Sequence, residues 1–199
     1  LIGKNNVVVL SPEEQTITKG GPSHRRKYFD KLFSVISSEY IETLQAYSRI
    51  LKQRNAAIKA VKKNINHPGG VKIWNDQLVF YAIKLWSIRM SFLKEFKETI
   101  ISVVKRFDSN IVFDLRFVDK ITSEQVFSQK LLENRLIEIN KGTTTVGPHR
   151  DIFDFYWNDK NIRMFGSQGE HKTSLILLKL AETTFIKQKT NCYPILLLD

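Results

Sequence analysis

The residues from Phe165 to Thr173, which read FGSQGEHKT, are the part of the sequence best suited to contact a phosphate. A glycine-containing turn precedes a predicted helix, and the free amides of a helix N-terminus, its positive dipole and a serine hydroxyl together suit a phosphate. A structural explanation is also available, because Ser167 and Glu170 have the spacing of a capping box. From these residues by themselves both interpretations stay open.

The same stretch is similar to the phosphate-binding loop G-x-x-x-x-G-K-[ST], but it differs at one essential place. His171 replaces the second glycine. That glycine lets the backbone curl around the phosphates, so the histidine argues against such a loop. No other part of the chain carries this pattern either.

Asp199 is the second residue with possible chemistry, and it directly follows the apolar run of residues 195–198. In a Walker B strand a carboxylate at this place holds Mg²⁺, usually through water. Many strands end in aspartate, but this one follows Ser-Gln-Gly-Glu at a distance that fits one helix. The order of serine-x-glycine-acid, helix, apolar strand and aspartate is similar to the signature-to-Walker-B segment of ABC-type ATPases.

Five motifs, in order along nearly the whole chain, resemble those of the RecF family of DNA replication and repair proteins. They are SPEE with GGPSHRR in residues 11–30, YSRILKQRN in residues 47–55, TVGPHRD in residues 145–151, the stretch of residues 165–173, and PILLLD in residues 194–199. Two positions depart from the family pattern. Ile152 replaces the second aspartate that usually ends the Gly-Pro-His-Arg loop, and Glu170 stands where glutamine is common.

The chain has no Walker A loop, and the acidic residue expected after Asp199 is absent. Since RecF proteins carry Walker A ahead of the segment that begins here, we expect the chain to be an internal piece of a longer protein. By itself it should not hydrolyse ATP, because it cannot wrap the β-phosphate.

Two heptad-like apolar stripes, in residues 40–65 and 74–107, predict two long helices. Residues 64–70, with a proline and two glycines, must break the helix, so the two helices should form an antiparallel hairpin. Arg54 interrupts the first stripe, and we expect it to be an internal salt-bridge partner.

The remaining elements follow from shorter patterns. Strands are predicted at residues 7–10 and 111–118, a helix at 123–139, a β-hairpin formed by 152–157 and 162–165, a helix at 169–187 and a buried strand at 195–198. With the resemblance, the fold class is α/β: part of an ABC-ATPase head, incomplete as a P-loop NTPase, plus an all-α arm. The expected domains are head residues 1–22, arm residues 23–141 and head residues 142–199.

The positive charge is concentrated in the predicted arm. Residues 23–106 hold 17 of the 31 basic residues and 6 of the 20 acidic ones, so the rest of the chain is balanced at 14 of each. A basic segment beside a neutral one indicates a polyanionic partner, of which nucleic acid is the first candidate, although lysine-rich helices can also simply be solvated. A single cysteine, no metal-ligand spacing of histidines and no membrane-length apolar run fit a cytoplasmic protein without membrane contact.

Six basic residues of the arm are the candidates for contacts to DNA phosphates. They are Arg25, Arg26, Arg49, Lys52, Lys59 and Lys63. The first two begin a predicted helix, and the other four recur at steps of three, seven and four beside the apolar stripe. Such contacts confer little sequence preference.

The resemblance implies a mechanism for the intact protein. Two heads dimerise with ATP between them, and the signature residues Ser167, Gln168, Gly169 and Glu170 contact the nucleotide of the partner subunit. Asp199 holds Mg²⁺ through water. The closed dimer clamps double-stranded or gapped DNA and, with RecO and RecR as partners, helps to load recombinase at gaps.

Two other classes of protein remain possible from the sequence. A Rad50-like or SMC-like ABC-type head would share the signature, but its arm should be a much longer coiled coil than the turn at residues 68–70 allows. A non-enzymatic basic helical scaffold would use the signature only as a capping box.

Overall fold

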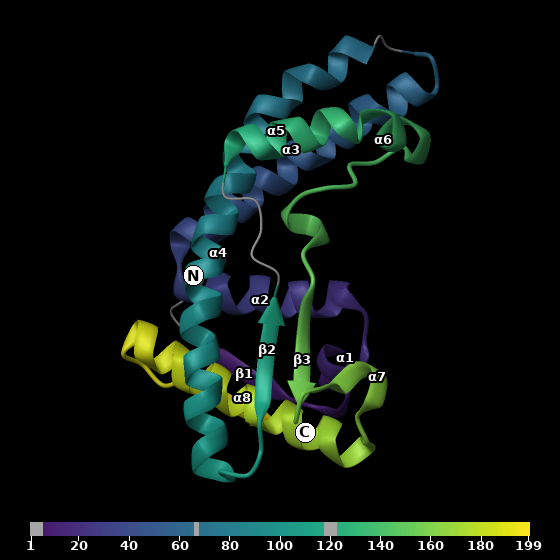
Figure 1. Ribbon diagram of the computed structural model, residues 1–199. Helices are drawn as coiled ribbons and strands as arrows, with labels where there is room; N and C mark the ends of the chain where they lie inside the picture. The colour runs from purple at the N-terminus through teal and green to yellow at the C-terminus, as the bar shows by residue number, and fades with distance from the viewer. Residues whose placement is uncertain (1–5, 66–67, 118–122) are drawn as a thin grey trace. The chain divides into compact units, whose positions relative to one another are not determined.

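The computed structural model describes residues 6–65, 68–117 and 123–199 of the chain (Figure 1). The chain divides into two compact units. Unit 1 contains residues 1–38, 91–118 and 152–199, and unit 2 contains residues 39–90 and 119–151. The division lies elsewhere than the expected head and arm boundaries, because residues 23–38 and 91–118 group with unit 1. The assignment of head and arm therefore stays a prediction.

Unit 1 combines two small sheets with helices. Its elements are β1 (Val7–Leu10), η1 (Pro12–Gln15), α1 (Thr16–Lys19), α2 (Pro22–Ile36), the second part of α4 (Asn75–Phe107), β2 (Phe113–Phe117), β3 (Phe153–Trp157), β4 (Lys160–Asn161), α7 (Ile162–Phe165), α8 (Gln168–Thr190) and β5 (Ile195–Leu198). Strands β1 and β5 pair in parallel, and β2, β3 and β4 form an antiparallel sheet in that order. The predicted strands at residues 7–10 and within 111–117 are confirmed.

The hairpin between β3 and β4 has the expected turn but a shorter second strand. Asn158 and Asp159 have φ angles of 46° and 63°, as a two-residue hairpin turn requires. The prediction of a strand at residues 162–165 is wrong, because these residues form helix α7. The physical reason is a local cap: the Asn161 side chain accepts a hydrogen bond from the Arg163 N–H (3.1 Å) and starts the helix.

An aromatic cluster forms the centre of unit 1, where α2, α4, α8 and β3 meet. The ring of Phe29 lies 5.0 Å from that of Phe153 and 6.0 Å from that of Phe96, and Phe96 lies 5.3 Å from Phe185. These four rings are at most 2% exposed. Large aromatic rings bury much apolar area in edge-to-face pairs, so this cluster fixes α8 against α2 and β3.

Unit 2 is helical. It contains α3 (Ser38–Lys62), η2 (Pro68–Trp74), the first part of α4, α5 (Glu124–Glu133), α6 (Arg135–Lys141) and η3 (Pro148–Arg150). The Arg89 side chain of α4 hydrogen-bonds Tyr40 near the start of α3, and Asn75 at the start of α4 hydrogen-bonds Arg54 further along α3. Contacts in this reversed order confirm the antiparallel helical hairpin.

The predicted apolar stripes are correct in part. Tyr40, Tyr47, Ile58, Leu78, Leu85, Phe96 and Ile100 are buried as expected. The ends are wrong, since Ile65 is 75% exposed and Phe107 is 57% exposed. In α4 the buried side chains include Leu93 and Val104, each one position after a predicted one, because a straight helix drifts relative to a seven-residue repeat.

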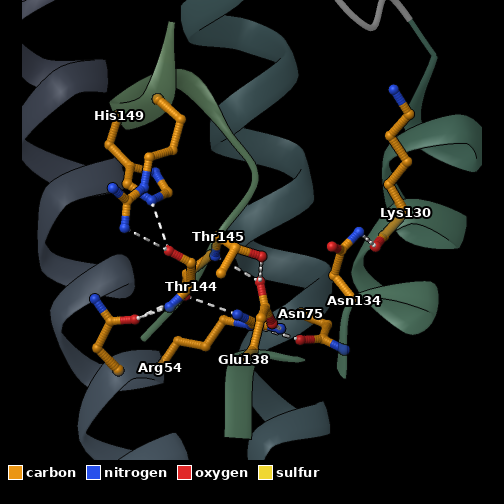
Figure 2. Close-up of polar contacts among 10 residues, drawn as sticks. Arg54, Asn75, Lys130, Asn134, Glu138, Thr144, Thr145 and His149 are labelled. Carbon is orange, nitrogen blue, oxygen red and sulfur yellow. Dashed lines mark hydrogen bonds and ion pairs between the residues drawn. The ribbon is translucent and has the colours of Figure 1, made fainter. Parts of the chain in front are cut away.

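The predicted helix of residues 123–139 is two helices. Asn134 ends α5, and its Nδ2 donates to the Lys130 carbonyl oxygen at 2.8 Å (Figure 2). Helix α6 then ends at Gly142, whose φ of 74° is the left-handed C-cap conformation that glycine adopts readily.

Within the described ranges, no helix is long and apolar enough to cross a bilayer.

Candidate functional site

The N-terminus of α8 carries the capping box and is open to solvent. The Glu170 N–H donates to Ser167 Oγ (3.2 Å), and the Ser167 N–H donates to Glu170 Oε2 (2.7 Å). The hydrogen bonds from the backbone N–H and the side chain of Ser167 to the carboxylate hold the pKa of Glu170 below its ordinary value of 4.5. Ser167, Gln168 and Gly169 are exposed. The structural role of the motif is therefore present, and its helix end is also accessible to a ligand.

The two glycines of this motif have different reasons to be glycine. A Cβ on Gly166 would lie 2.5 Å from the Ile162 carbonyl oxygen, so close packing excludes a larger residue. A Cβ on Gly169 would meet only Ser167 Oγ, at 4.0 Å, and the space is otherwise open. Glycine inside a helix costs up to about 1 kcal/mol relative to alanine. The fold therefore gives no reason for Gly169, whereas close approach of a ligand would.

His171 and Lys179 bind α8 to the segment that follows β1. His171 is 5% exposed, and its Nδ1 lies 3.0 Å from Thr18 Oγ1. Burial and the charge of Lys19 lower the pKa of His171. Lys179 forms ion pairs with Glu14 of η1 and with Glu182. The histidine in place of the P-loop glycine is thus a packing residue, and the SPEE motif contacts α8, the helix that begins with the signature.

Asp199 lies at the end of β5, close to the first turns of α8. Its N–H donates to the Leu10 carbonyl oxygen at 3.1 Å, which continues the β1–β5 pairing. Asp199 is exposed and lines a pocket of about 180 Å³. The other lining residues are Leu10, Ser11, Pro12, Gln15, Lys172, Leu175 and Ile176. The structure therefore brings Asp199 to Lys172, which follows the signature; the four signature residues do not line this pocket.

The prediction that the strand of residues 195–198 is buried is wrong for the described part of the chain. Its four side chains are between 44% and 69% exposed. The physical reason is that β5 only pairs with β1 along one edge. This pairing satisfies backbone hydrogen bonds but does not cover the faces of the strand, so its apolar side chains form an uncovered surface of unit 1. No group of three or more histidine, cysteine or acidic side chains that could hold a metal ion occurs among the described residues.

Arg25 is buried, which argues against the predicted contact to DNA. It is 2% exposed, and its guanidinium donates to the carbonyl oxygens of Phe153 and Gly20 and pairs with Asp154 (3.0 Å). Burial lowers its pKa, while Asp154 acts in the opposite direction. Arg25 thus links α2 to β3. The neighbouring Arg26 is half-buried and has an interaction of its own.

The four α3-side candidates have the exposure that a nucleic-acid contact needs. Arg49, Lys52 and Lys59 are exposed on α3, and Lys63 is exposed directly after it. Among the described residues, no ion pair occupies these four cations. They remain candidates for phosphate contacts.

Arg54, in contrast, is an internal residue, as predicted. Figure 2 shows its side chain among Glu138, Thr144 and Asn75. Its Nη2 pairs with Glu138 Oε2 at 2.7 Å, Nη1 donates to Thr144 Oγ1 at 2.7 Å, and Nε donates to Asn75 Oδ1 at 2.9 Å. Arg54 and Glu138 are 2% and 1% exposed. The expected internal salt bridge is confirmed, and its partner is Glu138.

Two of the motifs, residues 47–55 and 145–151, contact each other in unit 2. Tyr47 Oη lies 2.6 Å from His149 Nδ1, and Asn55 Oδ1 accepts from the Thr144 N–H at 2.7 Å, beside the second motif. Burial raises the pKa of Tyr47 above its ordinary value of 10.0. Sequence reasoning missed this contact, because no pattern within either motif shows which distant segment it contacts.

Asp151 anchors the end of the second motif. Both of its carboxylate oxygens accept from Trp86 Nε1 at 3.0 Å, and Arg89 Nη1 lies 2.6 Å from Oδ2. Asp151 is 3% exposed and Arg89 is 2% exposed. Buried polar groups therefore hold the end of the Gly-Pro-His-Arg-Asp loop, and Arg150 on the loop is exposed.

Comparison with known proteins gives one consistent result. A DNA replication and repair protein RecF of Lachnoclostridium phytofermentans is 37% identical over 200 residues, and that of Lysinibacillus sphaericus is 36% identical over 209 residues. Both matches include the whole chain and 55% and 56% of the relative's length. The chain thus spans about half the length of the curated relatives it matches. No family model matches it.

Solved structures agree. The recombination mediator protein RecF in the RecFOR pathway, as RecF-ATPrS and as RecF-ATP, matches the whole chain with TM-scores of 0.91 and 0.92. The sequence identities are 29% and 28%, and the matches cover 56% and 55% of those chains. The fold of this chain is therefore that of part of an ABC-type ATPase.

Proposed function

Because the chain corresponds along its whole length to a segment of the RecF family of DNA replication and repair proteins, we propose that it belongs to an ATP-dependent DNA-binding protein of recombinational repair. Two copies of the complete protein bind ATP between them, and the closed dimer holds duplex or gapped DNA and helps to load recombinase. RecR and RecO are the proposed protein partners, in keeping with the RecFOR pathway named for the solved structures.

The observation that carries this proposal is the open N-terminus of α8. Ser167 presents a hydroxyl there, and the helix contributes its free amides and dipole. Gly169 adds no side chain on the side where a ligand would approach. We propose that these residues, with Gln168 and Glu170, contact the γ-phosphate of ATP held by the partner subunit. This contact would exist only with ATP present, so the nucleotide would control the dimer.

Asp199 would act with the nucleotide of its own subunit. Mg²⁺ keeps several waters and needs only one or two protein carboxylates, so an exposed carboxylate at a strand end fits such an ion held through water. When bound, the ion would neutralise charge on the phosphates. Lys172 lines the same pocket as Asp199, and its positive charge would attract the phosphates.

DNA would contact the exposed face of α3. Arg49, Lys52, Lys59 and Lys63 provide cations without sequence discrimination. Arg25 is excluded from this set by its burial, and Arg26 is left out because it is half-buried and already has a partner.

Two substitutions of Ser167 distinguish the proposed ATP contact from a purely structural capping role. A chimera is suitable, in which this chain replaces the 200 matched residues of the Lachnoclostridium phytofermentans relative. In Ser167→Asp the cap is preserved, because aspartate is a good N-cap, but a negative charge faces the phosphate. ATP-dependent dimerisation, measured by light scattering after gel filtration, should be lost without a change in thermal stability.

Ser167→Ala is the complementary variant, because it removes the cap and should cost about 1 kcal/mol of stability. Ser102→Arg, at an exposed position of α4 in the same unit, is the control for a surface change and should leave dimerisation intact. If the Ser167→Asp chimera dimerises with ATP as well as the unmodified chimera, the motif is only a cap and the proposed ATP contact is wrong.

A further inference from the structure

Unit 2 contains a small pocket whose ionisable lining residues, in the described part of the chain, are all cationic. Arg54, Lys72 and Arg135 line it together with Asn75, and its cavity volume is about 120 Å³. The remaining lining residues are Gly69, Val71, Leu131 and Leu132. Among the described residues that line it, none is acidic. The pocket is separate from the signature helix and Asp199, which belong to unit 1.

The charge in this pocket is not balanced by the fold. Glu138, which does not line the pocket, neutralises Arg54 through an ion pair of 2.7 Å between Nη2 and Oε2. Lys72 and Arg135 are exposed, and within the described residues neither has an ion pair. Two positive charges therefore remain at one small concavity, which favours an anionic ligand.

Three elements contribute residues with hydrogen-bond donors to the lining of this pocket. Arg54 on α3 uses one N–H of each nitrogen for Asn75, Glu138 and Thr144 (Figure 2), which leaves one N–H on Nη1 and one on Nη2. Asn75 accepts from Arg54 with Oδ1, so its amide nitrogen stays a donor. Arg135 adds a guanidinium from α6.

The apolar part of the lining also strengthens polar contacts in this pocket. The apolar walls of Val71, Leu131 and Leu132 lower the local dielectric constant and strengthen polar contacts made beside them. Donors that converge from several directions suit a tetrahedral anion with several acceptor oxygens.

We propose that this pocket is a phosphate-binding site, with Arg54, Lys72, Asn75 and Arg135 as its ligands. The phosphate belongs either to a nucleic-acid backbone or to a free phosphorylated small molecule. The proposal goes beyond the DNA contact assigned to α3, because these side chains are not those of that face.

The test uses the whole chain and inorganic phosphate as the probe, with affinity measured by calorimetry at constant ionic strength. The variant is Lys72→Gln with Arg135→Gln, two exposed positions where folding should be unaffected. The matched control is Lys84→Gln with Lys141→Gln, which removes the same charge from exposed positions of the same unit that have no proposed phosphate contact. Phosphate should bind at least about tenfold more weakly to the pocket variant, since a charge-assisted contact is worth that much or more, and normally to the control.

The proposal is overturned if the unmodified chain shows no saturable phosphate binding. It is also overturned if both variants weaken that binding equally. A duplex-binding measurement then identifies the source of the phosphate. If the pocket variant also loses duplex affinity, the ligand is the nucleic-acid backbone; if its duplex affinity is unchanged, the ligand is a small molecule. Duplex affinity should be lost in Lys59→Gln with Lys63→Gln whether or not the pocket binds phosphate, so failure of the α3 contact and failure of the pocket are distinguishable.

Discussion

Arg54 and Glu138 form an ion pair with 2.7 Å between Nη2 and Oε2, and both side chains are almost completely buried. The pair joins α3 to α6. Glu138 Oε1 also accepts from the Thr145 N–H at 2.8 Å, so the same carboxylate holds the loop that leads to His149. One buried pair therefore fixes two helices and a loop of unit 2.

Loss of one member of this pair should be costly. In Arg54→Met the carboxylate of Glu138 stays buried without its cation, and removal of one partner of a buried pair typically costs about 3–5 kcal/mol. We expect a decrease of this size in the free energy of unfolding, measured by urea denaturation. Arg54→Met combined with Glu138→Leu should recover part of it, since no unpaired charge remains. A double variant less stable than the single one would contradict this explanation.

The exposed cations near α3 give a prediction about DNA. Replacement of Lys52, Lys59 and Lys63 by glutamate should weaken duplex binding and flatten its salt dependence. Each lost phosphate contact reduces the slope of log K against log salt by about 0.9. A titration of labelled duplex at several salt concentrations, followed by fluorescence anisotropy, measures both effects.

The control for this triple variant carries the same change of charge in unit 1. Lys27, Lys94 and Lys105 are exposed there, and their replacement by glutamate tests the effect of net charge by itself. An equal loss of affinity in both triple variants would show that α3 has no special role.

Gly147 is required by both its conformation and its surroundings. Its φ is +135°, and a Cβ there would lie 2.6 Å from Tyr47 Oη. Gly147→Ala should therefore cost about 1–3 kcal/mol of stability and disturb the contact between Tyr47 and His149. Thermal and urea denaturation check this. Gly169→Ala is the opposite case and should raise stability by up to about 1 kcal/mol; equal effects at the two glycines would refute the argument.

The lowered pKa of Glu170 should make the free energy of unfolding depend on pH. Its pKa in the folded chain lies below the ordinary value of 4.5 because the Ser167 backbone N–H and side chain hydrogen-bond the carboxylate. The stabilisation is therefore present above that ordinary pKa and is lost as pH falls through the lower, folded value. We expect the stability difference between the unmodified chain and Glu170→Gln to shrink as the pH falls below the ordinary pKa of 4.5. A constant difference would argue against the capping interaction in solution.

Local patterns in the sequence were sufficient for several features. The heptad stripes, broken by the proline and glycines near residue 68, predicted the helical hairpin, and the charged residue on an apolar seam identified Arg54 as internal. The Ser-x-x-Glu spacing predicted the capping box at Ser167. The order of five motifs along the chain indicated the RecF family. Each of these depends on spacing within one or two elements, which the sequence records directly.

Tertiary structure decided which side chains meet. Arg25 and Lys52 look alike in sequence as basic residues on predicted helices, yet Arg25 is buried against β3 and Lys52 is exposed. The partner of Arg54, at position 138, and the contact between Tyr47 and His149 likewise depend on segments about 80 to 100 residues apart. Periodicity shows which face of an element is apolar, but it does not show which other element covers that face or which polar group satisfies a buried charge. That information exists only once the chain has folded.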